Sequence, residues 1–185
     1  MSPLLRRRPV LTTLAVAAAS AAATVVLGGC AVLSSFLPTS APVRDATGTI
    51  TEAEEHTDVF ALRVGDCLAA DGGPEPFGVD GAPEGEDVWE APTVPCSEPH
   101  ETEIYHAVQL GGEEFPGEDA LGLRADDACY AAFTPFVGLE YEESYLDYTL
   151  IMPTAQSWSG GDREVLCLIG DPSSLVTGTL EDSGV

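Results

Sequence analysis

Residues 117–138 read GEDALGLRADDACYAAFTPFVG and carry the clearest period in the sequence. Apolar side chains recur at spacings of three to five, as on the buried face of a helix. They are Ala120, Leu123, Ala128, Ala132 and Phe136, with Leu121, Ala125, Cys129 and Phe133 beside them. Glu118 and Asp119 favour the positive end of a helix dipole, Gly138 suits a C-terminal stop, and Pro135 predicts a frayed or kinked last turn. The stretch therefore predicts one amphipathic helix.

The segments around this helix have the β-branched and aromatic content of strands and are bounded by turn residues. The predicted strands are 59–64, 103–110, 145–152, 163–169 and a last one at 175–180. Glycines, prolines and seven acids crowd residues 69–93, which predicts a long surface loop. A helix inserted into a run of antiparallel strands predicts an α+β fold, a small antiparallel sheet with one helix packed on it, over residues 59–181.

Four cysteines lie beyond position 30 without any C-x-x-C spacing: Cys67, Cys96, Cys129 and Cys167. An even set of this kind in an exported chain predicts two disulfides rather than a metal site or a nucleophile. Three pairings are possible, and the sequence alone does not choose among them. We favour Cys67 with Cys96 and Cys129 with Cys167, since each bridge would join neighbouring elements and the second would fasten the helix to a strand.

The N-terminus has the parts of a lipoprotein export signal. Arginines at positions 6, 7 and 8 precede an uncharged apolar run that ends in Leu27-Gly-Gly-Cys30. We expect residues 1–29 to be removed and Cys30 to carry two acyl chains, which hold a protein stably on a membrane. The alternative is a transmembrane anchor from about Val10 to Leu37, but glycine, serine and proline interrupt that run before the ~20 residues that a span needs. Residues 30–58, rich in Ser, Thr, Ala and Pro, predict a flexible tether to an extracytoplasmic domain.

The chain is strongly acidic, with 31 Asp and Glu against 7 Lys and Arg and a net charge of −24. Removal of the three arginines at 6–8 would take −24 to −27. Such a field repels nucleic acid, so no nucleic-acid partner is expected. The sequence contains no lysine, which excludes a Walker A loop, Ser-x-x-Lys acyl transfer and Schiff-base chemistry. We expect no cofactor, no metal and no enzymatic activity.

Several short motifs follow one another along the chain. They are Val64-Gly-Asp-Cys-Leu68, Val94-Pro-Cys-Ser-Glu-Pro-His100 running into Glu103, Phe115-Pro-Gly117, Cys129 with Phe133, Val137-Gly138, Pro153 to Trp158, Gly161-Asp-Arg163 and Cys167. Together they resemble the actinobacterial septum-formation domain over roughly residues 60–170. The resemblance implies an extracytoplasmic domain named for septum formation in cell division. It carries over no catalytic residue.

Two histidines and an acid form the most chemically suggestive cluster. His100 and His106, together with an acid, could supply the three ligands of an open zinc site. The acids of the cluster are Glu98, Glu101 and Glu103. This alternative predicts a metal-dependent envelope hydrolase that uses His100 and His106. The interpretation we prefer is structural: His100 and Glu103 form local hydrogen bonds that fix the loop at Cys96, because a buried polar side chain needs partners.

Trp158 lies in a loop rich in Gly and Ser, beside Asp162 and Arg163. An exposed aromatic side chain among adaptable polar residues is typical of a binding site. The interpretation we prefer is structural: Trp158 caps the sheet edge while Asp162 pairs with Arg163 or with a backbone donor. The exposed interpretation predicts that Trp158→Ala weakens partner binding and leaves thermal stability nearly unchanged.

These features predict a membrane-anchored extracytoplasmic lipoprotein. We expect it to act as a binding or accessory domain in envelope or septum formation, with an unidentified envelope or division protein as its partner. A purely structural accessory domain without a ligand is the remaining alternative.

Overall fold

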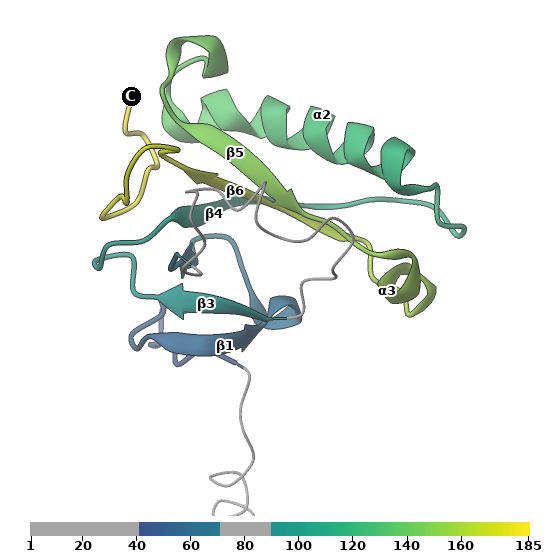
Figure 1. The fold of residues 1–185 in the computed structure, drawn as a ribbon, viewed down its shortest axis with the longest axis horizontal. Coiled ribbons are helices and arrows are strands. Elements are labelled where there is room, and N and C mark those ends of the chain that lie inside the picture. The colour runs from purple at the N-terminus through teal and green to yellow at the C-terminus, as the bar shows by residue number, and fades with distance from the viewer. Residues whose placement is uncertain (1–40, 71–89) are drawn as a thin grey trace, which may run out of the picture. The chain divides into compact units, whose positions relative to one another are not determined.

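The computed structural model describes residues 41–70 and 90–185 of the 185-residue chain, all of which belong to one compact unit, Thr39–Val185 (Figure 1). The predicted signal at 1–29 and residues 30–40 of the predicted tether lie outside the described residues. The strands are β1 (Glu54–Asp58), β2 (Cys67–Leu68), β3 (Glu90–Val94), β4 (Thr102–Gln109), β5 (Asp147–Ile151) and β6 (Glu164–Gly170). The helices are α2 (Glu118–Val137) and α3 (Ala155–Ser159), with single 3-10 turns η2 (Val59–Ala61) and η3 (Tyr141–Glu143).

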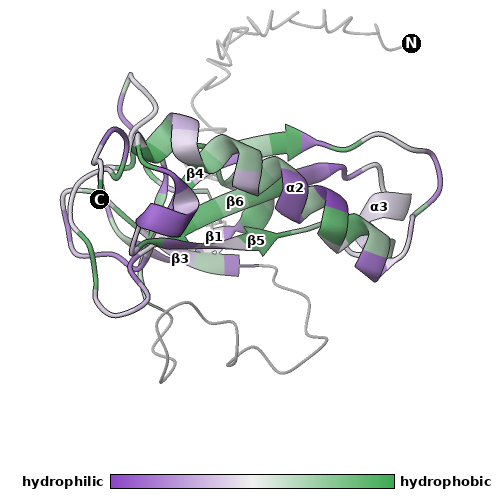
Figure 2. Ribbon diagram, turned by 90° about the horizontal axis from the view of Figure 1, so that it is seen from above, coloured by the Kyte–Doolittle hydropathy of each residue, from purple (hydrophilic) through white to green (hydrophobic). Residues whose placement is uncertain are grey.

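The six strands form one antiparallel sheet in the order β1-β3-β2-β4-β6-β5. Helix α2 lies along the face of the β4-β6-β5 part (Figure 1). The strands beneath the helix are predominantly hydrophobic, whereas the helix itself mixes hydrophobic and hydrophilic residues along its length (Figure 2). The predicted α+β fold, an antiparallel sheet with one helix packed on it and two disulfides, is confirmed. No helix of the described residues is long and apolar enough to cross a membrane.

Helix α2 buries a single stripe with a spacing of four residues. The stripe consists of Leu121, Ala125, Cys129, Phe133 and Val137, each no more than 1% exposed. The first set of apolar residues expected from the sequence lies beside this stripe, and its member Leu123 is 71% exposed. The helix passes through Pro135 without ending there and stops at Gly138, whose φ of 82° is left-handed. Only the last turn follows Pro135, so the hydrogen bond that proline cannot donate is lost close to the end of the helix.

Strand β6 is apolar along its length because both of its faces are buried. Val165, Cys167 and Ile169 face α2 and belong to the main core, whereas Leu166 and Leu168 belong to a second core on the opposite face. Side chains alternate between the two faces of a strand, so a strand covered on both sides carries no polar alternation. The second core is completed by residues of η2, β2, β3 and β4 and their flanks: Val59, Leu62, Leu68, Ala91 and Ile104.

The N-terminal boundary of the domain was predicted wrongly. Residues 41–58, expected to be a tether, are folded, and the first strand occupies 54–58 rather than 59–64. Thr57 is fully buried and its hydroxyl lies 2.8 Å from that of Thr93. Arg44 forms an ion pair with the buried Asp66, with 2.7 Å between Nη2 and Oδ2. The one residue that edge strand β1 buries is this threonine, and the rest of the strand is polar and at least partly exposed. The strand therefore shows no apolar period in the sequence.

Three further segments differ from their predictions. Strand β3 lies within the predicted loop 69–93, of which residues 71–89 are outside the described part, and its Pro92 is unusual for a strand. Helix α3 lies in the predicted loop 153–162 and begins with a capping box between Thr154 and Ser157. The strand expected at 175–180 is reduced to one bridge, between Val176 and His100. All three are short, and a short element gives little periodic signal.

Tyrosine hydroxyls link α2 to β5 and η3 at the side of the main core. The hydroxyl of Tyr148 donates to Asp126 at 2.7 Å, and that of Tyr141 donates to Asp147 at 2.8 Å. Tyr105 donates to the Cys129 carbonyl at 2.7 Å. Burial raises the pKa of Tyr105 and, with the bond to Asp126, that of Tyr148. The hydrogen bond to Asp147 together with burial raises the pKa of Tyr141 to about 12.

We therefore expect the domain to lose stability above pH 10. A folded-state pKa raised above the ordinary value of 10 means that the unfolded chain releases its tyrosine protons first. This contribution to stability is complete below about pH 10 and is lost as the pH rises through the folded values. Urea unfolding between about pH 8 and 12, with tyrosinate absorbance, measures it. Tyr148→Phe should flatten the decline, and tyrosinate formation near pH 10 in the intact fold would contradict the prediction.

Candidate functional site

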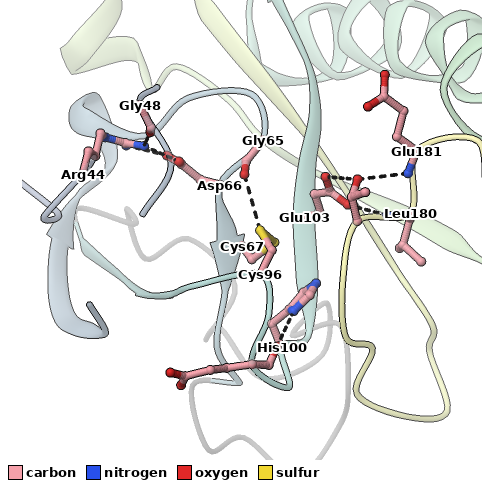
Figure 3. Close-up of a disulfide and its surroundings, with 12 residues drawn as sticks. Arg44, Gly48, Gly65, Asp66, Cys67, Cys96, His100, Glu103, Leu180 and Glu181 are labelled. Carbon is pink, nitrogen blue, oxygen red and sulfur yellow. Dashed lines mark hydrogen bonds and ion pairs between the residues drawn. A yellow bond between two sulfur atoms is a disulfide. The ribbon is translucent and has the colours of Figure 1, made fainter. Parts of the chain in front are cut away.

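Both predicted disulfides are present. Cys67 of β2 is bonded to Cys96, which follows β3, and Cys129 of α2 is bonded to Cys167 of β6. The first bridge lies beside His100 and Glu103 (Figure 3). Cys129 and Cys167 are fully buried at the centre of the main core, so the second bridge fastens the helix to the sheet as expected.

Glu103 fastens the C-terminal segment rather than the loop at Cys96. Its carboxylate is almost fully buried and accepts two hydrogen bonds, from the Thr179 hydroxyl and from the Leu180 backbone N–H, each at 2.7 Å (Figure 3). The backbone N–H of Gly178 also donates to the Cys96 carbonyl at 2.7 Å. The predicted local bond network is therefore corrected: Glu103 acts over more than seventy residues of sequence, and the segment 178–180 reaches the Cys96 loop through the backbone.

Glu103→Gln should lower the free energy of unfolding by about 1–3 kcal/mol. Glutamine offers one acceptor oxygen, so its amide NH₂ would face one of the two donors that the carboxylate now satisfies. Chemical denaturation measures the effect, with Glu98→Gln as the matched control because the Glu98 side chain is exposed. Equal stability of the two variants would mean that the 178–180 segment is held without Glu103.

His100 is fully buried and does form the expected local bond. Its Nδ1 lies 2.8 Å from the Glu98 carbonyl oxygen, and because a carbonyl only accepts, Nδ1 carries the proton. Among the buried side-chain nitrogen and oxygen atoms of the described residues, Nε2 of His100 is the one without a hydrogen-bond partner. His106 lies on β4 opposite Cys167 and is partly buried.

The zinc alternative lacks its ligand set in the described part of the chain. Nowhere in residues 41–70 and 90–185 do three His, Cys, Asp or Glu side chains gather closely enough to hold a metal ion. The carboxylate of Glu103 is already turned to Thr179 and Leu180. Within the part of the chain that the structure describes, His100 and His106 therefore have no third ligand for an open catalytic site.

Trp158 is a core residue, which corrects its interpretation as an exposed aromatic. It is 2% exposed, its ring packs edge-on against Phe115, and its indole N–H donates to the Glu113 carbonyl at 3.3 Å. The guanidinium of Arg163 lies 3.9 Å from the ring centroid. Arg163 also donates to the Gly112 carbonyl at 3.0 Å and to that of Trp158 at 2.7 Å. These contacts hold α3 against the segment that leads into α2. This role is close to the structural one considered from the sequence, in which Trp158 caps the sheet edge.

Asp162 uses a backbone donor, the second possibility raised from the sequence. Its Oδ1 accepts the N–H of Glu164 at 3.1 Å, while Arg163 contacts the Asp162 carbonyl. Unlike Arg163, Asp162 lines a groove on the surface. It is the one predicted binding residue that lines this groove.

The groove lies between η2, the end of β5, helix α3 and the start of β6. Its lining residues are Val59, Phe60, Ile151, Met152, Thr154, Ser157, Asp162, Glu164 and Leu166. A second hollow shares Phe60, Ser157 and Asp162 with the groove and is also lined by Gln156 and Gly160. Phe60 is 59% exposed and Met152 is 37% exposed. Large apolar side chains left in water beside a hollow are typical of an interaction surface.

No sequence pattern predicted that Phe60 and Met152 are exposed. Both lie in stretches predicted as strands, where an apolar residue is expected to point into a core. Strand β1 ends at Asp58, whose carboxylate caps η2 through the Phe60 N–H at 2.9 Å, and the turn that follows directs Phe60 outward. Met152 follows the last residue of β5 and is likewise released from the sheet.

Comparisons with known proteins point to one family. No curated protein and no solved structure matches the chain. A family model described as septum formation matches residues 42–176, well over half of the chain. The match begins where the described fold begins and includes both disulfides, the Trp158 contacts and the groove. The chain belongs to the septum-formation family.

Proposed function

We propose that this chain is a lipid-anchored extracytoplasmic protein that takes part in septum formation by binding a partner. Family membership gives the role in division or the envelope. Pairing of all four cysteines of the domain is the observation that carries the location, because such bridges persist outside the cytoplasm. The signal-like residues before Cys30 support anchoring through that sulfur.

Binding, rather than catalysis, is the mode of action that the groove supports best. Five of its nine lining residues are apolar. Its two carboxylates already accept internal hydrogen bonds, Asp162 from the Glu164 N–H and Glu164 from the Gln109 side chain at 2.9 Å. A general acid or base must be free to form a hydrogen bond with the group whose proton it transfers. A mixed lining of apolar and acidic side chains instead fits contact with another surface.

The intact mass of protein purified from membranes of the native host tests this proposal. We expect a chain that begins at Cys30 with a diacylglyceryl group, and alkylation of the four remaining cysteines only after reduction. Cys30→Ala should prevent processing and should reduce septum formation in a strain that depends on the protein. An unprocessed wild-type chain, free thiols before reduction, or normal division without the protein would contradict the proposal.

A further inference from the structure

We infer that the groove beside Phe60 docks a basic, partly apolar segment of a partner protein. The inference rests on the proposed function, which places the domain outside the cytoplasm and has it act by binding a partner. It adds the chemistry of that partner. Protein surfaces that bind a segment combine apolar anchors with charges complementary to it. The groove supplies both.

The anchors are the two exposed side chains and the buried floor between them. Phe60 and Met152 leave much of their surface in water, while Val59 and Leu166 beneath them are 8% and 4% exposed. A partner's aliphatic side chain placed between Phe60 and Met152 would cover apolar surface that the fold leaves open. Methionine adapts its shape to such contacts, and aromatic residues dominate the energetics of interfaces.

The charge of the groove has one sign. Asp162 and Glu164 line it, and no basic side chain is among its described lining residues. Three of the four arginines in the described residues bind within the domain: Arg44 to Asp66, Arg124 to the Gly111 carbonyl at 3.1 Å, and Arg163 to the Trp158 ring. The fourth, Arg63, is exposed and does not line the groove. A second copy of this chain, with its net charge of −24, an anionic lipid or a nucleic acid would be repelled. A lysine- or arginine-bearing segment would be attracted.

The groove is also preformed. Helix α3 is fixed by its capping box and by the buried Trp158, and η2 is fixed by the Asp58 cap and by Arg44, which donates to the Ala61 carbonyl at 3.1 Å. A site whose walls are already ordered loses little conformational freedom when it is occupied. Binding can therefore use the contacts of Phe60 and Met152 without first ordering the backbone around them.

Fluorescence anisotropy tests the inference on the full chain, as processed by its host and held in nanodiscs of uncharged lipid. The probe is a peptide in which lysine and leucine alternate with serine, carrying an uncharged fluorophore. A companion peptide has glutamate in place of lysine. We expect the lysine peptide to bind, more weakly at high salt, and the glutamate peptide not to bind. Equal binding of the two peptides would overturn the inference.

Two sets of substitutions place the binding at the groove. Phe60→Ser with Met152→Ser should weaken the lysine peptide by about tenfold or more. Asp162→Asn with Glu164→Gln keeps the internal acceptors and should weaken it about threefold to tenfold while flattening the salt dependence. The matched control is Leu123→Ser with Asp127→Asn and Glu143→Gln, which removes an exposed apolar side chain and two carboxylates elsewhere. If this control weakens binding as much as the groove variants do, the peptide is held by overall charge and the inference fails.

Photocrosslinking in the native host identifies the natural occupant. A photoreactive amino acid replaces Phe60 in one strain and Leu123 in another, and mass spectrometry reads the crosslinked segment. A basic segment of another protein, captured from position 60 only, supports the inference. An acidic or uncharged segment, a second copy of this chain, or no crosslink above the level at position 123 overturns it. Processing at Cys30 does not depend on Phe60, so this failure would leave the proposed anchoring and role in division standing.

Discussion

Cys129→Ala with Cys167→Ala should lower the free energy of unfolding by about 2–5 kcal/mol. The bridge closes a loop with a sequence separation of 38, so its loss restores considerable freedom to the unfolded chain. Both cysteines are fully buried between α2 and β6, where the alanine variant also leaves the space of two sulfur atoms. Urea denaturation of the variant and of the wild type gives the difference.

The other disulfide provides the matched control. Cys67→Ala with Cys96→Ala opens a bridge of similar separation, 29. Cys67 lies on β2 opposite Val94, and Cys96 follows β3 two residues later, so strand pairing already holds the two ends close together. Cys96 is also partly exposed, so less packing is lost there. We expect the smaller loss of stability from this pair. The prediction fails if opening Cys67–Cys96 costs more stability than opening Cys129–Cys167, or if opening Cys129–Cys167 changes nothing. In the second case α2 is held by its apolar stripe alone.

Helix α2 and the disulfides were predictable because their signals are local and redundant. The helix has an apolar period, acids in its first turn and a glycine at its end, and each of these depends on nearby residues only. The even number of cysteines predicted two disulfides, and the observed pairing is the one in which each bridge joins neighbouring elements. Strands β4 and β6 were found because they are long, eight and seven residues, and rich in β-branched, aromatic and aliphatic side chains.

The N-terminal half was predicted less well because its contacts are distant and polar. Strand β1 is held by Thr57 against Thr93, and the segment before it by Arg44 against Asp66, over separations of 36 and 22 residues. No local sequence pattern predicts such pairs. The groove was missed for the same reason: Phe60, Met152 and Asp162 come from three parts of the chain, and two of them look like core residues in sequence.

Trp158→Ala should lower the free energy of unfolding by about 3–5 kcal/mol. An exposed tryptophan would instead lose partner binding without a change in stability. The side chain is 2% exposed, and its removal leaves a cavity beside Phe115 and takes away the surface on which Arg163 stacks. The Glu113 carbonyl also loses its indole donor. Guanidinium denaturation with a constant m-value measures the loss in stability directly.

Two companion variants separate packing from binding. Trp158→Phe keeps most of the apolar volume but no indole donor, so it should cost less than the alanine variant. Phe60→Ser removes a side chain that is 59% exposed and should change stability by no more than about 0.5 kcal/mol while weakening the lysine peptide. If Trp158→Ala instead kept wild-type stability and lost the peptide, Trp158 would be a contact residue and the contacts around Arg163 would not hold α3. Because α3 forms one wall of the groove, a destabilised Trp158 variant should also bind the peptide less well, but in proportion to the fraction unfolded.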